Sequence, residues 1–145
     1  MFPRSRTIRS RTGRGRCRRL GVAATEFAIV APVFFLMVVG FIEFGRALMV
    51  QQVLINASRV GARMASTTGA TSSAVQSAVQ SYTAGVAVPG VSVAISPNPA
   101  TAAAGTVITV TASVPFSSVS WMSTPWFLSG KTLTANSQMR KEGYD

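Results

Sequence analysis

Apolar residues dominate one long stretch near the start of the chain. The 23 residues from Leu20 to Ile42 carry a single charged side chain, Glu26. At about 1.5 Å per residue, a helix of this length spans the roughly 30 Å hydrocarbon layer of a bilayer. Core helices of soluble domains rarely need so long an apolar run, so the sequence predicts one membrane-crossing helix.

The helical periodicity continues past Ile42, where apolar and polar residues lie on different faces. Apolar residues recur every three or four positions, and polar residues occupy the other faces up to the break at residues 66–69. We therefore expect the helix to leave the membrane and continue as an amphipathic extension covered by the rest of the chain. Its expected apolar stripe is Ala47, Val50, Val53, Leu54, Ala57, Val60, Gly61 and Met64.

Shorter patterns follow this helix. Residues 70–83 have helical spacing and can begin with Thr71 or Ser72 as the N-cap, so they predict a second short helix that could lie against the first. Alternating residues at 91–95, 106–114 and 131–139 predict a small antiparallel sheet, with Ile108, Val110, Ala112 and Val114 facing inward. The expected fold class is an α+β membrane protein.

An aromatic segment separates the last two predicted strands. Residues 114–130 read VPFSSVSWMSTPWFLSG and contain Phe116, Trp121, Trp126 and Phe127. Packing in the core under a loop is the favoured interpretation. A belt at the membrane interface, a subunit contact and a sugar- or adhesin-type binding site remain as alternatives, because tryptophan is favoured in these settings too.

Basic residues are concentrated before the apolar stretch. The chain carries a formal charge of +10, and without its leading arginines only six of its 14 basic residues remain, against four acids. The positive-inside rule predicts a cytoplasmic N-terminus and a C-terminal region across the membrane. The tail should be disordered on anionic lipid, and it lacks the interleaved aromatics of nucleic-acid binders. The eight arginines are Arg4, Arg6, Arg9, Arg11, Arg14, Arg16, Arg18 and Arg19.

Residues that carry enzymatic chemistry are scarce. The sequence has no histidine and a single cysteine, Cys17, so it offers no Ser-His constellation and no intramolecular disulfide. Its few acids form no pair or cluster along the sequence, and no glycine-rich phosphate loop follows a predicted strand. We therefore expect neither an enzyme nor a cofactor or metal site.

Glu26 is the anomaly within the predicted span. A carboxylate inside a membrane helix costs up to about 2.5–3.5 kcal/mol on insertion scales and is usually paired. Its partner could be the arginines at the interface, a neighbouring chain or a new charge created by proteolysis. A cut after Gly21 would leave Val22 with a free ammonium four residues before Glu26, on the same helix face.

These residues resemble a known processing site. A basic leader, Gly21, four small or apolar residues, Glu26, Phe27 and an apolar run are similar to type IV prepilins and pseudopilins. Pro32 in the span, the Glu-Phe-Gly-Arg sequence at 43–46 and the Asn-Ala-Ser-Arg sequence at 56–59 narrow the resemblance. Residues 20–64 resemble the TadE-like pseudopilins of tight-adherence (Tad, or Flp) pilus systems.

The resemblance implies a role for each matched residue and a set of partners. A prepilin peptidase would cut between Gly21 and Val22, and Glu26 with Phe27 would take part in assembly. Other pilins or pseudopilins, Tad inner-membrane assembly proteins and membrane lipid are the implied partners, with no nucleic acid. The expected domains are a leader at 1–21, a membrane and amphipathic helix at 22–66, and an exterior α/β region at 70–145.

Five further positions of the helix are candidates for a kink, for packing or for pairing. Pro32 removes a backbone hydrogen bond and is expected to kink the helix. Gly40 and Gly45 would let a partner helix approach closely. Glu43 and Arg46 are spaced to pair with each other or to anchor to lipid headgroups, and an ion pair between subunits is the alternative.

Two classes of function follow. The favoured class is a minor pilin or pseudopilin of the inner membrane that assembles into or beneath a pilus. The alternative is an unprocessed single-pass scaffold that binds another envelope protein or a ligand. A secreted domain freed by signal peptidase is disfavoured, because the end of the hydrophobic run offers poor cleavage residues.

Overall fold

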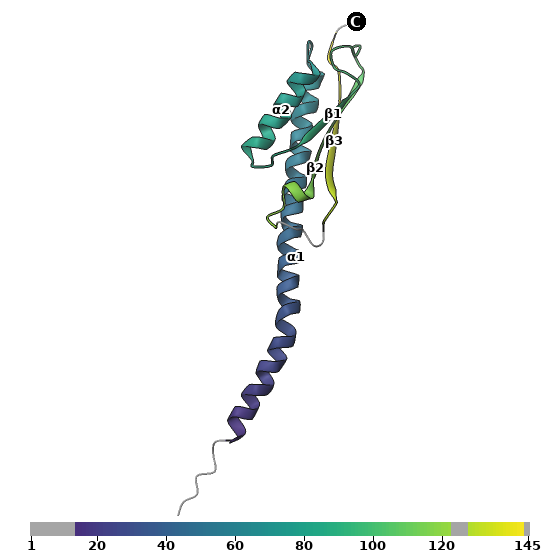
Figure 1. Cartoon of the computed structure of the whole chain (residues 1–145). Coiled ribbons are helices and arrows are strands. Elements are labelled where there is room, and N and C mark those ends of the chain that lie inside the picture. Colours follow the sequence, from purple (N-terminus) through teal and green to yellow (C-terminus); the bar gives the residue numbers. More distant parts are fainter. Residues whose placement is uncertain (1–13, 123–127, 144–145) are drawn as a thin grey trace, which may run out of the picture. The chain divides into compact units, whose positions relative to one another are not determined.

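The computed structural model describes residues 14–122 and 128–143, with side chains from residue 21 onward. Helix α1 (Arg14–Ser66) and helix α2 (Ser72–Gly85) precede strands β1 (Ser92–Ser96), β2 (Val107–Pro115) and β3 (Thr132–Arg140), and the short 3₁₀ helix η1 (Phe116–Ser118) follows β2 (Figure 1). The predicted α+β fold class is confirmed. The chain forms two compact units, Met1–Val39 and Gly40–Asp145, and their boundary falls inside α1.

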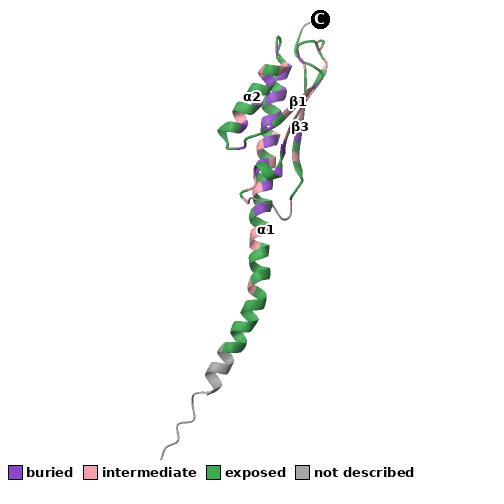
Figure 2. Cartoon of the chain, viewed as in Figure 1, coloured by how far each residue is buried: buried purple, intermediate pink, exposed green. Residues whose placement is uncertain are grey.

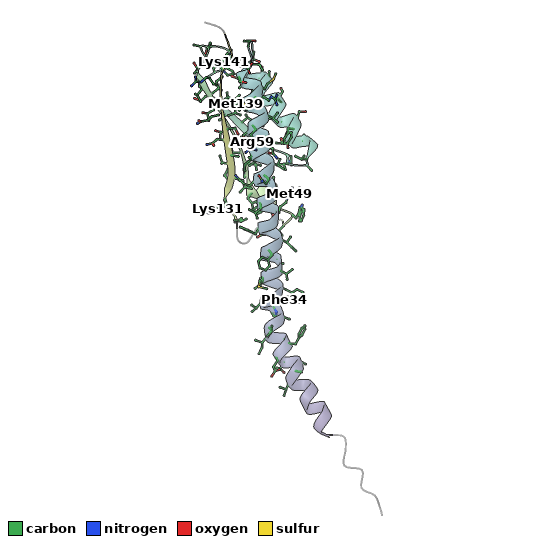
Figure 3. The ribbon with its side chains drawn as sticks, turned by 180° about the vertical axis from the view of Figure 1, so that it is seen from behind. Phe34, Met49, Arg59, Lys131, Met139 and Lys141 are labelled. Atoms are coloured by element: carbon green, nitrogen blue, oxygen red, sulfur yellow. The ribbon has the colours of Figure 1, made fainter. Side chains whose placement is uncertain are left out.

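The first part of α1 is apolar and exposed. Its residues from Gly21 to Ile42 are exposed or half-buried, as the green and pink ribbon shows (Figure 2). Phe34, 53% exposed, is one of the side chains that project from this part of the helix (Figure 3). In the described part of the chain, α1 is the one helix long and apolar enough to cross a membrane. Such a helix fits a membrane-anchored single-pass protein.

The Gly40–Asp145 unit, called the exterior unit here, is a two-layer α/β structure. Its three strands form an antiparallel sheet in the order β1-β2-β3, in which Val110 pairs with Ile95 on one side and Ser137 on the other. The alternation of β2 buries one face and leaves a Ser/Thr-rich face toward solvent. The inward residues are the predicted ones, Ile108, Val110, Ala112 and Val114, and all are fully buried.

Helix α1 lies on the inward face of the sheet. The side-chain amide of Gln51 donates to the Thr134 carbonyl oxygen of β3 at 2.9 Å, and the hydroxyls of Ser58 and Ser137 hydrogen-bond at 2.8 Å. In the same part of α1, Val50 and Leu54 are fully buried in the same core as the β2 residues. The amphipathic extension is therefore covered by the sheet, as its pattern predicted.

Helix α2 begins at the predicted cap and packs against α1. The Thr71 hydroxyl accepts a hydrogen bond from the Ala74 backbone N–H at 3.3 Å, which satisfies one of the free donors of the first turn. Val75 and Val79 are fully buried and approach α1 at Gly61. The expected contact between the two helices is confirmed.

The predicted stripe on α1 is correct at six of its eight positions and wrong at two. Val60 and Met64 remain 38% and 39% exposed, whereas Ala62 and Ala65 are fully buried. Close approach of α2 and the sheet favours small side chains at the contact, so the larger ones lie at its margin. A pattern that weights residues by hydrophobicity selects the larger ones instead.

The aromatic segment divides between core and surface. Phe116 is fully buried and Leu128 packs against the core, which confirms core packing for these two residues. Trp121 is 72% exposed, so core packing is wrong for this side chain. Trp126 and Phe127 lie outside the described residues.

Gly61 should be sensitive to any added side chain. A Cβ there would lie 2.6 Å from Val79 Cγ2 and 2.9 Å from Val110 Cγ1, and both valines are buried and stiff at χ1. We expect Gly61→Ala to lower the free energy of unfolding by about 1–3 kcal/mol, in spite of alanine's better helix propensity. Urea unfolding of the detergent-solubilised chain, followed by circular dichroism, measures the change.

Gly45→Ala is the matched control. This glycine lies in the same helix with no atom near its missing Cβ, so the substitution should leave stability unchanged or raise it by up to about 1 kcal/mol. Equal stability changes in both variants would contradict the close contact at Gly61.

Candidate functional site

The four residues at the expected processing site lie on the first exposed turns of α1. Gly21, Val22, Glu26 and Phe27 are all exposed and helical, and Val22 and Phe27 keep 57% and 70% of their surface accessible. Val22 and Glu26 are four residues apart in a continuous helix and therefore share one face. The structure thus places the expected new amino terminus and the carboxylate one turn apart.

The peptide bond expected to be cut lies within the helix. The Thr25 hydroxyl donates to the Gly21 carbonyl oxygen at 2.9 Å, in addition to the helical pattern of backbone bonds. Gly21 has no side chain, and no atom would contact a Cβ added there. A peptidase that binds an extended substrate would have to unwind this turn, and glycine is the residue whose helical state is least stable apart from proline.

Glu26 has no hydrogen bond to any described residue. It is exposed on the apolar part of α1, and neither a basic nor an acidic residue lies between it and Glu43. The side chains of Arg18 and Arg19, which could pair with it at the interface, lie outside the described side chains. The described structure therefore gives this carboxylate no counter-charge.

Pro32 does not end the helix. It lies inside α1, which continues for more than thirty residues beyond it. The expected kink at this position stays a prediction. The two glycines that follow differ in their surroundings: Gly40 is half-buried, while Gly45 is exposed with open space around it.

Glu43 is buried in the first turn of the exterior unit. It is 3% exposed, and both carboxylate oxygens lack a hydrogen-bond partner in the described structure. The expected pairing with Arg46 is not formed, although the two residues have suitable spacing. An unpaired buried carboxylate is costly because it loses its hydration without gaining a partner.

Arg46 binds the segment after η1 instead. Its Nε donates to the Val119 carbonyl oxygen at 2.9 Å, and its guanidinium carbon lies 5.3 Å from the centroid of a Trp121 ring. A longer contact of 3.5 Å joins Nη2 to the Ala87 carbonyl oxygen. The guanidinium of Arg46 thus binds carbonyl and aromatic groups that are distant in the chain, whereas it was expected to pair with the nearby carboxylate of Glu43.

The partners of Arg46 were missed at the level of the sequence. Two of them are backbone carbonyls, which leave no trace in residue identity. Trp121 was visible as part of the aromatic segment, but nothing in the spacing of residues 46 and 121 connects them. Arg46 and Trp121 come into contact because β2 and η1 lead the chain back to α1.

The helix that carries these residues matches a known family. Residues 21–63 match the sequence model of the TadE-like protein family. This segment is TadE-like. No curated protein and no solved structure matches the chain. The TadE-like segment begins at Gly21 and includes Glu26, Pro32, Glu43 and Arg46, so the resemblance expected from these residues is confirmed.

The TadE-like segment makes up less than a third of the chain. Within the described residues, no group of three or more Cys, Asp or Glu side chains is placed to hold a metal ion. The charged side chains of the candidate site, Glu26, Glu43 and Arg46, lie on helix α1.

Replacing the buried Glu43 should stabilise the exterior unit. Glu43→Met keeps a similar volume and removes two oxygens that have no described partner, so we expect the free energy of unfolding to rise by about 1–3 kcal/mol. Urea unfolding in detergent micelles measures this change. Glu142→Met, at an exposed position, is the control and should leave stability unchanged. A less stable Glu43→Met variant would show that the carboxylate makes a favourable contact.

Proposed function

We propose that this chain is a minor pilin or pseudopilin that takes part in the assembly of a Tad/Flp pilus or a related secretion apparatus. The observation that carries the proposal is the position of Glu26. It is an exposed carboxylate without a described partner, on an apolar helix, five residues after the glycine at which the TadE-like match begins.

Cleavage after Gly21 would give this carboxylate its counter-ion. The ammonium of Val22 would lie one helical turn from Glu26, in a region where an ion pair gains strength from the low dielectric. The carboxylate would also offset the unfavourable placement of a cation at a helix N-terminus. The pairing can form within one subunit or between the ammonium of one subunit and the Glu26 of its neighbour.

Pairing between subunits would set their register in an assembly. If neighbouring helices were shifted by a turn, each would leave an ammonium and a carboxylate unpaired among apolar side chains, at a cost of several kcal/mol. The apolar surface of α1 from Gly21 to Ile42 is available to neighbouring helices, because these residues are exposed or half-buried in the single chain. Charge would specify the arrangement and the apolar surface would supply contact area.

The proposed location follows from the arginines before Leu20. Their excess supports an N-terminus in the cytoplasm and an exterior unit in the periplasm, with passage to the cell surface if the subunit enters a fibre. A prepilin peptidase, other pilins and the inner-membrane assembly proteins of the Tad system are the proposed partners. The alternative, an unprocessed membrane scaffold, would retain the arginine-rich leader.

The mass of the mature protein tests processing. We expect the chain recovered from membranes to have lost residues 1–21 and to begin at Val22, as determined by intact mass spectrometry. Expression without a prepilin peptidase should give the full-length mass. Full-length protein in cells that contain the peptidase and assemble pili would contradict the processing step and favour the scaffold.

Loss of the Glu26 charge tests assembly. We expect Glu26→Gln to insert into the membrane in normal amount and to reduce pilus or secretion output at least tenfold, since about 1.4 kcal/mol of lost pairing already corresponds to tenfold. Immunoblots of membranes and counts of pili provide the two measurements. Glu142→Gln removes an exposed acid far from the helix in sequence and should assemble normally. Normal output from Glu26→Gln would contradict the proposed pairing.

A further inference from the structure

We propose that Trp121 and Arg46 form a lipid anchor that holds the exterior unit in the phospholipid headgroup layer at the C-terminal end of the span. The inference concerns the exterior unit and rests on the membrane anchoring of α1, independently of pilus assembly. Its occupant is the headgroup and glycerol region of the bilayer.

The most exposed large apolar side chains of the exterior unit gather at one place. Within the described part of this unit, the large apolar side chains that are at least half exposed are Phe41, Ile42, Phe44, Leu48 and Trp121. Four of them lie on two turns of α1, and the fifth lies against Arg46, which belongs to the same turns. Among these five, Trp121 has the largest exposed fraction, at 72%.

The position of Arg46 along α1 sets the depth of this cluster. With the hydrocarbon layer ending at Ile42, Arg46 lies four residues, or about 6 Å, farther along the helix. The polar layer on each side of a bilayer is about 5–7 Å thick, the difference between the full bilayer and its hydrocarbon core. Arg46 is therefore level with the headgroups, and a ring whose centroid lies 5.3 Å from its guanidinium lies within that layer or directly beside it.

The ring is held at this depth by a hydrogen bond near it. Arg46 Nε donates to the carbonyl oxygen of Val119, two residues before Trp121, at 2.9 Å. Stacking on the guanidinium adds a cation–π contact. The indole therefore cannot move along the helix without breaking the contacts that Arg46 makes with Val119 and Trp121.

The chemistry of the pair suits a headgroup layer. Indole combines an apolar ring with one N–H donor, and tryptophan is enriched where bilayer and water meet. A guanidinium has five N–H donors, and the one on Nε is taken by the Val119 carbonyl oxygen. Nη1 donates to Met49 Sδ at 3.5 Å, an ordinary length for a sulfur acceptor, and Nη2 makes a long contact of 3.5 Å with the Ala87 carbonyl. Since each of these nitrogens carries two N–H groups, each retains a donor for a lipid phosphate.

Depth-dependent fluorescence quenching tests the anchor. The chain has two tryptophans, so Trp126→Phe leaves Trp121 as the only one. This full-length variant is reconstituted into phosphatidylcholine vesicles that carry bromine either near the carboxyl end or near the methyl end of the acyl chains. We expect a larger loss of emission with the shallow bromines than with the deep ones, and a blue shift relative to the urea-unfolded chain.

Two arginine variants provide the matched comparison. Arg46→Ala in the same background should reduce the loss of emission caused by shallow bromines, because the ring loses the group that holds it. Arg59→Ala changes an exposed arginine of the same helix about 20 Å farther from the span, and it should leave quenching unchanged (Figure 3). Circular dichroism of each variant identifies any loss of fold.

A second measurement tests the anchor even if the Trp126→Phe variant folds poorly. The shallow quenching of the natural chain should exceed that of Trp121→Phe, since the difference belongs to Trp121. Emission that is insensitive to bromine at either depth and fully quenched by aqueous acrylamide would overturn the anchor. Emission that changes with the ratio of protein to lipid would overturn it too, by showing that another copy of the chain covers the ring.

Discussion

One helix, α1, has an exposed apolar part and a part that packs in the exterior unit. The rest of the structure depends on how the surface of the helix changes between these two parts. From Gly21 to Ile42 almost every face of α1 is apolar and exposed, as a helix surrounded by lipid or by other helices requires. From Ala47 onward, apolar residues keep to one face, which the sheet and α2 cover. Because the helix is continuous, the place where one pattern gives way to the other fixes where the exterior unit begins.

The turn between these patterns contains the charged residues of the TadE-like segment. Glu43 is buried without a described partner, while Arg46 binds a carbonyl and an indole from the segment after β2. The two charges are separated although their spacing would allow an ion pair. The guanidinium thereby connects the helix to a segment more than seventy residues away, and the carboxylate remains the costly member of the pair.

Much of the fold could be predicted because local patterns determine it. The alternation of residues 106–114 identified both the strand and its inward face, and the two cap candidates, Thr71 and Ser72, located the start of α2 to within one residue. The partners of Arg46 could not be predicted, since carbonyl groups carry no residue signature. The burial of Ala62 and Ala65 in place of Val60 and Met64 was also hidden, because small residues are selected by the closeness of a neighbour and not by their own hydrophobicity.

The close contact at Gly61 has a mechanical consequence. The space normally filled by a side chain is occupied by the methyl groups of Val79 and Val110. Helix α2 and strand β2 therefore both pack directly against the backbone of α1 at that point. Sliding the helix along its axis would push the bulkier neighbouring residues into the same space. A pull applied to α1 is therefore transmitted to the sheet as a shear load shared by its hydrogen-bonded strands, instead of drawing the helix out of the unit.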